Sequence, residues 1–138
     1  MGIRRDRRDP GGMDTRCLIA DDNLSFLMAM RYMLERDGID VVGSASNGDE
    51  ALQRAVELRP DVMLIDVRLG RDSGFDVARQ IQEAAAHTNW RPAIILVSTH
   101  AEDELSERMA ANPSLSFLDK TTVSAQKVRE RLGADCCH

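Results

Sequence analysis

Side chains that can bind a metal ion or a phosphoryl group follow four of the apolar runs of this sequence. Asp21 and Asp22 come after the first run, Asp66 after the third and Ser98 after the fourth, and Lys120 stands just past the fifth. Carboxylates gathered in one cleft repel each other, and a hard divalent ion such as Mg²⁺ relieves that repulsion. A bound metal also neutralises an incoming phosphoryl group, so that one carboxylate can attack phosphorus and form an aspartyl phosphate. A Lys ammonium suits a phosphoryl oxygen, and a Ser hydroxyl can hold another.

Each of these residues, taken alone, also has a purely structural interpretation as a helix cap, a turn residue or a solvated side chain. Taken together they follow successive strands, and in an open α/β sheet ligands bind outside the carboxyl ends of the strands. If the first, third and fourth strands are neighbours, the groups meet in one pocket. The combined pattern therefore favours a functional site.

The elements that must position this pocket alternate along the chain as short apolar runs and longer helical patterns. Continuous apolar strands are typical of a parallel sheet that is covered on both faces. The pattern therefore predicts an α/β fold, a three-layer (βα)5 sandwich. We expect strands over 16–20, 41–45, 62–65, 93–97 and 116–118, and helices over 24–37, 47–59, 75–85, 102–111 and 124–133. Local signals support the ends, with Gly38 as a helix stop and Ser124 as an N-cap flanked by Val123 and Val128 as a hydrophobic staple.

Composition and charge limit the classes of function. The chain has 138 residues, a net charge of -5 and a pI near 5.2, which disfavours a non-specific grip on nucleic acid. No apolar run is long enough to span a membrane, and we expect a cytoplasmic protein. We divide the chain into a disordered tail (1–13, with an Arg-rich cluster), one domain (14–133) and a C-terminal tail (134–138) that contains Cys136 and Cys137. Cys17 is expected to be a small core residue.

Four motifs carry a resemblance to a known family: LIADD ending at Asp22, VMLIDVRL around Asp66 followed by Gly74, IILVS ending at Ser98, and FLDK ending at Lys120. The chain resembles the receiver domain of bacterial two-component response regulators, a CheY-like domain, over nearly its whole length. The resemblance implies a flavodoxin-like sheet in the strand order 2-1-3-4-5.

The resemblance also implies roles for the polar residues. Asp66 would be the phosphoacceptor, and the donor would be a histidine kinase or a histidine phosphotransfer protein. Ser98 would bond the phosphoryl group, and Lys120 would pair with it. Mg²⁺ would be the cofactor, held by Asp21, Asp22, Asp66 and the backbone carbonyl of Arg68.

A switch function follows from the same resemblance. Phe117 matches the aromatic position whose ring turns inward as Ser98 moves, and we expect this pair to pass the signal to the fourth helix, the fifth strand and the fifth helix. The side chains at Arg68, Thr99 and His100 occupy positions that border the phosphoryl group and influence its lifetime.

Some positions depart from the family pattern. Gly70 stands where the family usually has Pro, so we expect a more mobile loop after Asp66. Thr99 replaces a usual Ala beside Ser98 and would crowd the site. Neither change removes a reacting group, so the departures bear on kinetics and switching.

The first helix has more apolar surface than one sheet contact requires, because Phe26, Met30 and Met33 extend beyond the stripe that contains Leu27 and Leu34. Two interpretations remain open. The last helix packs beside it, or residues such as Phe26 and Met33 form an exposed patch for a kinase or phosphotransfer partner.

The sequence thus predicts a phosphorylation-activated signalling switch that promotes its own phosphotransfer and is not a turnover enzyme. Two alternatives stay open: the receiver portion of a larger DNA-binding transcription regulator, and a phosphorylation-independent interaction module. We expect no direct contact of this chain with nucleic acid or membrane, and a homodimer is left open.

Overall fold

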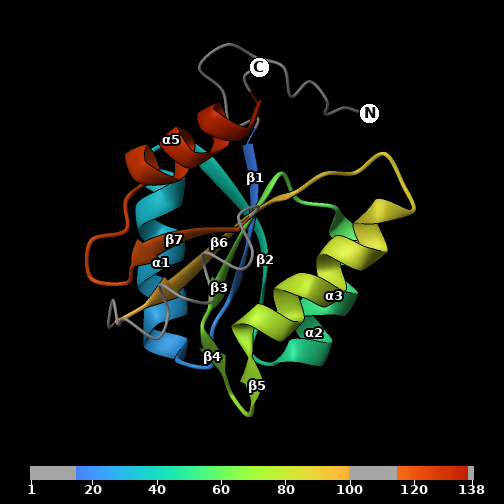
Figure 1. The fold of residues 1–138 in the computed structure, drawn as a ribbon. Coiled ribbons are helices and arrows are strands. Elements are labelled where there is room, and N and C mark those ends of the chain that lie inside the picture. The colour runs from blue at the N-terminus through green and yellow to red at the C-terminus, as the bar shows by residue number, and fades with distance from the viewer. Residues whose placement is uncertain (1–14, 100–114, 137–138) are drawn as a thin grey trace.

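Five parallel strands form the central sheet of the computed structural model, which describes residues 15–99 and 115–136 (Figure 1). The strands are β1 (Thr15–Ala20), β2 (Ile39–Ala45), β3 (Val62–Asp66), β6 (Ala93–Ser98) and β7 (Leu115–Asp119). Their order in the sheet is β2-β1-β3-β6-β7, and each neighbouring pair is parallel. This order confirms the predicted arrangement 2-1-3-4-5, because β6 and β7 are the fourth and fifth strands of the prediction.

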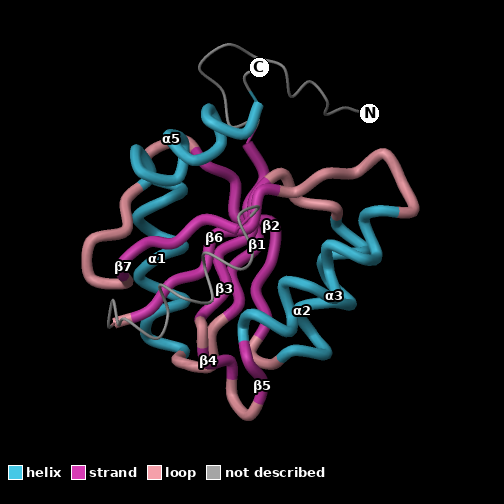
Figure 2. Tube along the Cα trace, in the orientation of Figure 1, coloured by secondary structure: helices cyan, strands magenta, loops and turns pink. Residues whose placement is uncertain are grey.

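Helices cover both faces of the sheet and make a three-layer sandwich (Figure 2). On one face lie α1 (Leu24–Arg36) and α5 (Ala125–Cys136), and on the other lie α2 (Gly48–Leu58) and α3 (Gly74–Ala86). Two apolar cores follow from this arrangement, since alternate residues of a strand point to opposite faces. In β3, for example, Val62 and Leu64 belong to the core beneath α1 and α5, whereas Met63 and Ile65 belong to the core beneath α2 and α3.

The helix ends are set by local chemistry that the sequence carries. The Asn23 side chain accepts a hydrogen bond from the backbone N–H of Phe26 and caps α1, and Gly38 follows that helix with a positive φ of 94°. At α5, Ser124 Oγ accepts from the backbone N–H of Lys127 at 3.2 Å, and Val123 and Val128 are both buried. The predicted stop of α1 at Gly38 and the predicted N-cap of α5 at Ser124 are therefore confirmed, whereas the cap of α1 by Asn23 is a new observation.

Two details differ from the expected elements. Helix α5 continues through Gly133 to Cys136, so the helical part extends into the predicted C-terminal tail. A glycine inside a helix costs about 1 kcal/mol relative to alanine. Helix α5 nevertheless continues for three residues beyond Gly133. The second difference is a small antiparallel hairpin, β4 (Arg68–Leu69) with β5 (Asp72–Ser73), in the segment expected to be an irregular loop.

The predicted N-terminal tail (1–13) and the predicted helix over 102–111 lie outside the described residues, and so does His100. Within the described segments, every helix is too short or too polar to reach across a bilayer.

Candidate metal centre

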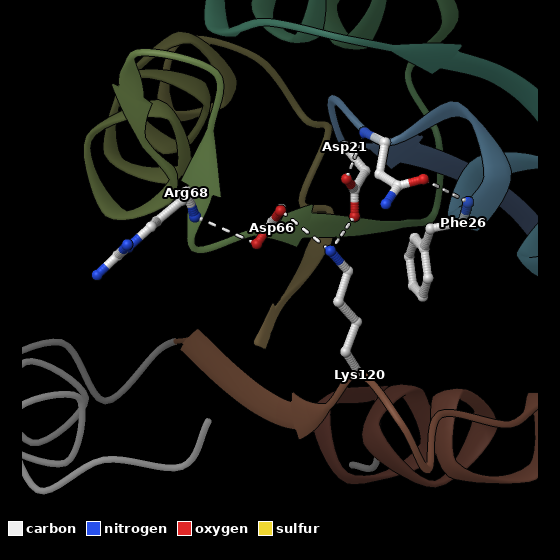
Figure 3. Close-up of polar contacts among 6 residues, drawn as sticks. Asp21, Phe26, Asp66, Arg68 and Lys120 are labelled. Atoms are coloured by element: carbon white, nitrogen blue, oxygen red, sulfur yellow. Dashed lines mark hydrogen bonds and ion pairs between the residues drawn. The ribbon is translucent and has the colours of Figure 1, made fainter. Parts of the chain in front are cut away.

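The strand ends bring the predicted polar residues to one edge of the sheet. Asp21 follows β1, Asp66 is the last residue of β3, and Lys120 follows β7. Because β1 and β3 are adjacent, and β6 joins β3 to β7, these positions share the carboxyl edge of the sheet. Figure 3 shows the side chains of Asp21, Asp66 and Lys120 directed toward one another across this edge.

The three carboxylates converge as the sequence predicted. Asp21, Asp22 and Asp66 each offer an oxygen that lies within 4.8 Å of the others. Their environments differ, because the Asp21 side chain is fully buried, Asp66 is half-buried and Asp22 is exposed. A cation bound here would therefore be held from the protein side and remain open to solvent on the side of Asp22.

Lys120 compensates the charge of the two inner carboxylates. Its Nζ lies 2.6 Å from Asp21 Oδ2 and 3.1 Å from Asp66 Oδ2. The side chain is only 13% exposed, so these ion pairs are weakly screened by water. The ammonium also lies over the ring of Phe26, 4.6 Å from its centroid, at a distance typical of a cation–π contact.

Backbone hydrogen bonds fix where Lys120 leaves the sheet. Its N–H donates to the Ser98 carbonyl at 2.8 Å, which ties the end of β7 to the end of β6. In the following turn, Asp119 Oδ1 accepts from the backbone N–H of Thr121 at 2.8 Å and from its hydroxyl at 2.7 Å. This turn holds the Lys120 backbone at the edge of the pocket.

Asp21 is held by a short chain of contacts that begins in β2 and ends in α1. Its N–H donates to the Ala45 carbonyl at 2.9 Å, and its Oδ1 accepts from the Asn23 N–H at 2.8 Å. The same Asn23 caps α1 through the N–H of Phe26, the residue whose ring meets Lys120. The acidic loop and the start of α1 are therefore built as one unit.

The electrostatics of the pocket are unbalanced without a further cation. Burial raises the pKa of Asp66, and the negative charge of Asp21 raises it further, against the opposing effects of the Arg68 N–H bond and of Lys120. For Lys120, burial by itself would lower the pKa, but hydrogen bonds and charge attraction from Asp21 and Asp66 outweigh it and raise the pKa above its ordinary value. One ammonium thus serves two carboxylates at once.

The donor set fits a hard divalent cation. Asp21 Oδ2 is buried, and within the described part of the chain the charged group that compensates it is the Lys120 ammonium, 2.6 Å away. All the candidate ligand atoms are carboxylate oxygens, the type that Mg²⁺ and Ca²⁺ prefer. A buried carboxylate oxygen that shares one ammonium with Asp66 and faces two further carboxylates is well suited to a metal bond.

The backbone after Asp66 turns tightly around the carboxylate. The Arg68 N–H donates to Asp66 Oδ1 at 3.2 Å, while the Arg68 side chain extends away from the pocket (Figure 3). Gly74 packs against this turn so closely that a Cβ there would overlap the Asp66 carbonyl oxygen. We expected a more mobile loop at Gly70. The structure has a hairpin in this segment, and Gly70 lies at its turn with a positive φ of 62°. A proline cannot adopt that φ.

The remaining predicted residues lie near the same edge but differ in exposure. Ser98 ends β6 and is half-buried, and Thr99 beside it is exposed. Phe117 is half-buried in β7 and packs against the core beneath α2 and α3. Sequence reasoning missed the contact between Phe26 and Lys120, for which the available signal was the position of Phe26 one helical turn after Asp22.

Helix α1 exposes other apolar residues than those expected. Phe26 and Met33 are half-buried and pack against the core that α5 contributes to, which favours the first of the two interpretations left open, packing of the last helix beside α1. The exposed apolar side chains are instead Leu24, Met28 and Tyr32, at 68%, 64% and 69% exposure. These residues recur every four positions and form one stripe, which we name the α1 stripe.

Comparisons with known proteins agree with the geometry. The family model described as the response regulator receiver domain matches residues 17–132. The transcriptional regulatory protein LiaR of Bacillus subtilis is 32% identical over 112 residues, which are 80% of this chain and 51% of LiaR. The transcriptional regulatory protein PdtaR of Mycobacterium tuberculosis is 32% identical over 105 residues, 76% of this chain and 49% of PdtaR. The chain therefore spans about half the length of these two relatives.

Solved structures show the same fold. The signal receiver domain of a modulated diguanylate cyclase from Desulfovibrio desulfuricans G20 has a TM-score of 0.71 at 28% identity, and the match covers 86% of this chain and 90% of that one. A structure of the CheX–CheY–BeF3–Mg complex from Borrelia burgdorferi has a TM-score of 0.74 at 17% identity and 90% coverage of both chains. At that identity the second likeness concerns the fold alone.

Proposed function

Because the chain belongs to the response regulator receiver family, a family of signalling switches in two-component systems, we propose that Asp66 is its phosphoacceptor. The observation that carries the proposal is the convergence of Asp21, Asp22 and Asp66 within 4.8 Å, with the Lys120 ammonium 3.1 Å from Asp66. Three acids and one ammonium at the same edge of the sheet suit a reaction in which charge moves onto one carboxylate.

The proposed reaction is a phosphoryl transfer to a carboxylate. An Asp66 oxygen attacks the phosphorus of a phosphohistidine, the new O–P bond forms, and the P–N bond to the donor imidazole breaks. The electron pair of that bond stays on the imidazole nitrogen, which then takes a proton. The Arg68 N–H donates to Asp66 Oδ1 and the Lys120 ammonium donates to Oδ2, so both oxygens of the acceptor are oriented before the transfer.

Receiver domains bind Mg²⁺ in an acidic pocket, and the acidic group described above fits such an ion. We assign the ion to the carboxylates of Asp21, Asp22 and Asp66 together with the backbone carbonyl of Arg68. When bound, Mg²⁺ supplies positive charge that offsets the charge of the phosphoryl group. Lys120 then pairs with a phosphoryl oxygen and continues to neutralise the buried Asp21.

The switch is proposed to run through Ser98 and Phe117. Ser98 lies at the end of β6, the strand beside β3, where its hydroxyl can bond a phosphoryl oxygen. Phe117 lies on the next strand, β7, where it pairs with Leu96. Thr99 borders the same oxygen, and His100 is the next residue in sequence. In an NMR titration with beryllofluoride, a phosphoryl mimic, we expect resonances over 99–120 to shift, and unshifted resonances would refute this route.

The phosphodonor is proposed to be a histidine kinase or a histidine phosphotransfer protein. The α1 stripe begins at Leu24, two positions after Asp22, and so an apolar surface adjoins the open side of the acidic pocket. Serine at Met28 should slow transfer from a phosphohistidine protein and leave phosphorylation by acetyl phosphate unchanged. Serine at Val56, which is exposed on α2 away from the stripe, is the matched control.

Location of the added phosphoryl group tests the function directly. Incubation with acetyl phosphate and Mg²⁺ should add about 80 Da, one phosphoryl group, to a peptide that contains Asp66. The addition should be absent from Asp66→Asn and from samples with EDTA, and present in Asp76→Asn, a change at a partly exposed carboxylate on α3. A wild-type protein without the added mass would favour the phosphorylation-independent interaction module.

The receiver portion of a longer transcription regulator is a second candidate, because the chain spans about half of LiaR and of PdtaR. The full reading frame would decide it. Four points remain predictions: the chain is a switch and no turnover enzyme, it acts in the cytoplasm, the domain covers 14–133, and the chain makes no direct contact with nucleic acid. A homodimer is still open.

A further inference from the structure

The segment after Asp66 is a paired hairpin with one buried anchor. Arg68 pairs with Ser73 and Leu69 pairs with Asp72, and the Leu69 side chain is fully buried. Gly70 has a positive φ at the first position of the two-residue turn, which fits a type II′ turn. A hairpin of two-residue strands is marginal by itself, so contacts with the rest of the fold must hold it in place.

One such contact joins the hairpin to a distant helix. The Asp72 carboxylate accepts a hydrogen bond from the backbone N–H of Gly48, the first residue of α2, at 2.8 Å. That N–H belongs to the first turn of the helix, whose N–H groups lack partners within the helix, and a carboxylate is favoured at this end of the helix dipole. Asp72 therefore caps α2 from the hairpin, across 24 positions of sequence.

Close packing shows that the contact is built into both elements. A Cβ at Gly48 would lie 2.6 Å from Asp72 Oδ2 and 3.0 Å from its Cγ. Any larger residue at position 48 would push the carboxylate away from the N–H that it accepts from. Glycine at 48 and aspartate at 72 thus form a matched pair.

The other end of the hairpin contacts the reacting carboxylate. The Arg68 N–H donates to Asp66 Oδ1, and the Gly74 N–H closes the segment by donating to the Val67 carbonyl at 2.7 Å. The hairpin is therefore held at its outer strand by Asp72 and touches Asp66 through its inner strand. A displacement of β5 moves β4 with it, because the two strands are paired.

We propose that Asp72 is a positioning residue for the phosphorylation site: its bond to the Gly48 N–H holds the β4–β5 hairpin so that the Arg68 backbone stays against Asp66. The proposal deepens the function proposed above and rests on it for its chemical consequence. The Arg68 N–H orients one oxygen of the acceptor, and the Arg68 carbonyl is the backbone ligand assigned to Mg²⁺.

The test compares three variants with the wild type. Asp72→Ala removes the acceptor, and Asp72→Asn keeps an oxygen acceptor without the charge. Asp49→Ala removes a carboxylate from the first turn of the same helix and leaves the bond between Asp72 and Gly48 in place. For Asp72→Ala we expect Mg²⁺ binding, followed by the Arg68 amide resonance, to weaken about fivefold, the scale of one hydrogen bond. Amide hydrogen exchange at Arg68 and Leu69 should quicken, and phosphorylation by acetyl phosphate should slow at limiting Mg²⁺ but recover at high Mg²⁺.

The Asn variant separates positioning from charge. If the bond matters, Asp72→Asn should stay near the wild type in Mg²⁺ affinity and in amide exchange, and so should Asp49→Ala. Gly48→Ala displaces the Asp72 carboxylate from the opposite side and should weaken Mg²⁺ binding as much as Asp72→Ala does. The double variant, Gly48→Ala with Asp72→Ala, should bind Mg²⁺ no more weakly than either single variant.

Equal Mg²⁺ affinity and equal exchange in Asp72→Ala and Asp49→Ala would overturn the proposal, and so would an Asn variant as impaired as the Ala variant. Failure of the proposed function looks different. In that case the wild type itself would bind no Mg²⁺ and take up no phosphoryl group, whereas the exchange of the Arg68 amide would still report whether Asp72 holds the hairpin.

Discussion

Replacement of Lys120 by Met should destabilise the metal-free protein and make its stability depend on Mg²⁺. Methionine is close to Lys in length but carries no charge, so the change removes the ammonium 2.6 Å from Asp21 and 3.1 Å from Asp66. Asp21 is fully buried and is left with an uncompensated charge. This is the situation in which loss of one partner of an ion pair is most damaging.

The expected magnitude follows from the exposure of the partners. Removal of one member of a fully buried pair costs about 3–5 kcal/mol. Lys120 and Asp66 are each 13% exposed, so water reaches part of the site and the loss should be nearer about 2–3 kcal/mol. Because the folded-state pKa of Lys120 is raised, its stabilisation is fully present below its ordinary pKa of 10.5 and is lost only as the pH rises through the folded-state value.

The assay is urea unfolding at neutral pH, followed by the fluorescence of Trp90 and performed in EDTA and in saturating Mg²⁺. Lys127→Met is the matched control, since Lys127 is the other lysine of the chain and lies half-buried on α5. At a hundredfold excess over its Kd a ligand stabilises by about 2.7 kcal/mol. The control gains stability in the same way, so the gap changes only if the two proteins differ in Mg²⁺ affinity. Without the ammonium at the shared carboxylates, Lys120→Met should bind Mg²⁺ more tightly than the control, and the gap between the two should narrow.

Two results would refute the reasoning. One is a Lys120→Met protein as stable in EDTA as Lys127→Met, which would mean that the ammonium does not compensate Asp21. The other is a gap that Mg²⁺ leaves unchanged, which would mean that the divalent ion and the ammonium do not serve the same carboxylates.

Further predictions concern single residues of the described fold. Burial raises the pKa of Asp66, so ionisation of this carboxyl opposes folding. Asp66→Asn should therefore become more stable than the metal-free wild type as the pH rises through the folded-state pKa. Urea titrations at acidic and neutral pH should show that the difference in stability vanishes below the ordinary pKa of 3.8. Gly74→Ala should cost about 3 kcal/mol because its Cβ would overlap the backbone. Gly70→Ala, whose Cβ would make only an ordinary contact but which has a positive φ, should cost about 1 kcal/mol in the same assay. Burial raises the pKa of the Cys17 thiol, so peptide mapping should find this thiol unmodified by iodoacetamide until the protein unfolds.

The sheet and the main site residues could be predicted because the relevant signals are local. Four apolar residues in a row before Asp66 specify a strand that is buried on both faces, and the topology of parallel sheets then places the residue after each strand on one edge. That rule alone brings Asp21, Asp66 and Lys120 together. It needs no knowledge of how the helices rotate.

The contacts that were missed depend on such rotation. The face of α1 that is buried could not be read from its sequence, because apolar residues occur around most of the helix and the period alone leaves several faces equivalent. Packing against α5 decides that Phe26 is half-buried and Met28 exposed. The β4–β5 hairpin has two-residue strands, too short for any periodic pattern, and the bond of Asp72 to Gly48 joins elements whose distance no local signal encodes.

The structural element that supplies each site residue also determines whether its removal lowers mainly the stability or mainly the Mg²⁺ affinity. Lys120 is placed by β7 and neutralises carboxylates from β1 and β3, so its removal disturbs charges that the whole sheet brings together. Asp72 acts through a hairpin that joins the sheet at one end only, so its removal should weaken Mg²⁺ binding while global unfolding changes little. The ratio of lost Mg²⁺ affinity to lost stability should consequently be small for Lys120→Met and large for Asp72→Ala. An equal ratio for the two would mean that the hairpin is an integral part of the cooperative core and no separate support of the site.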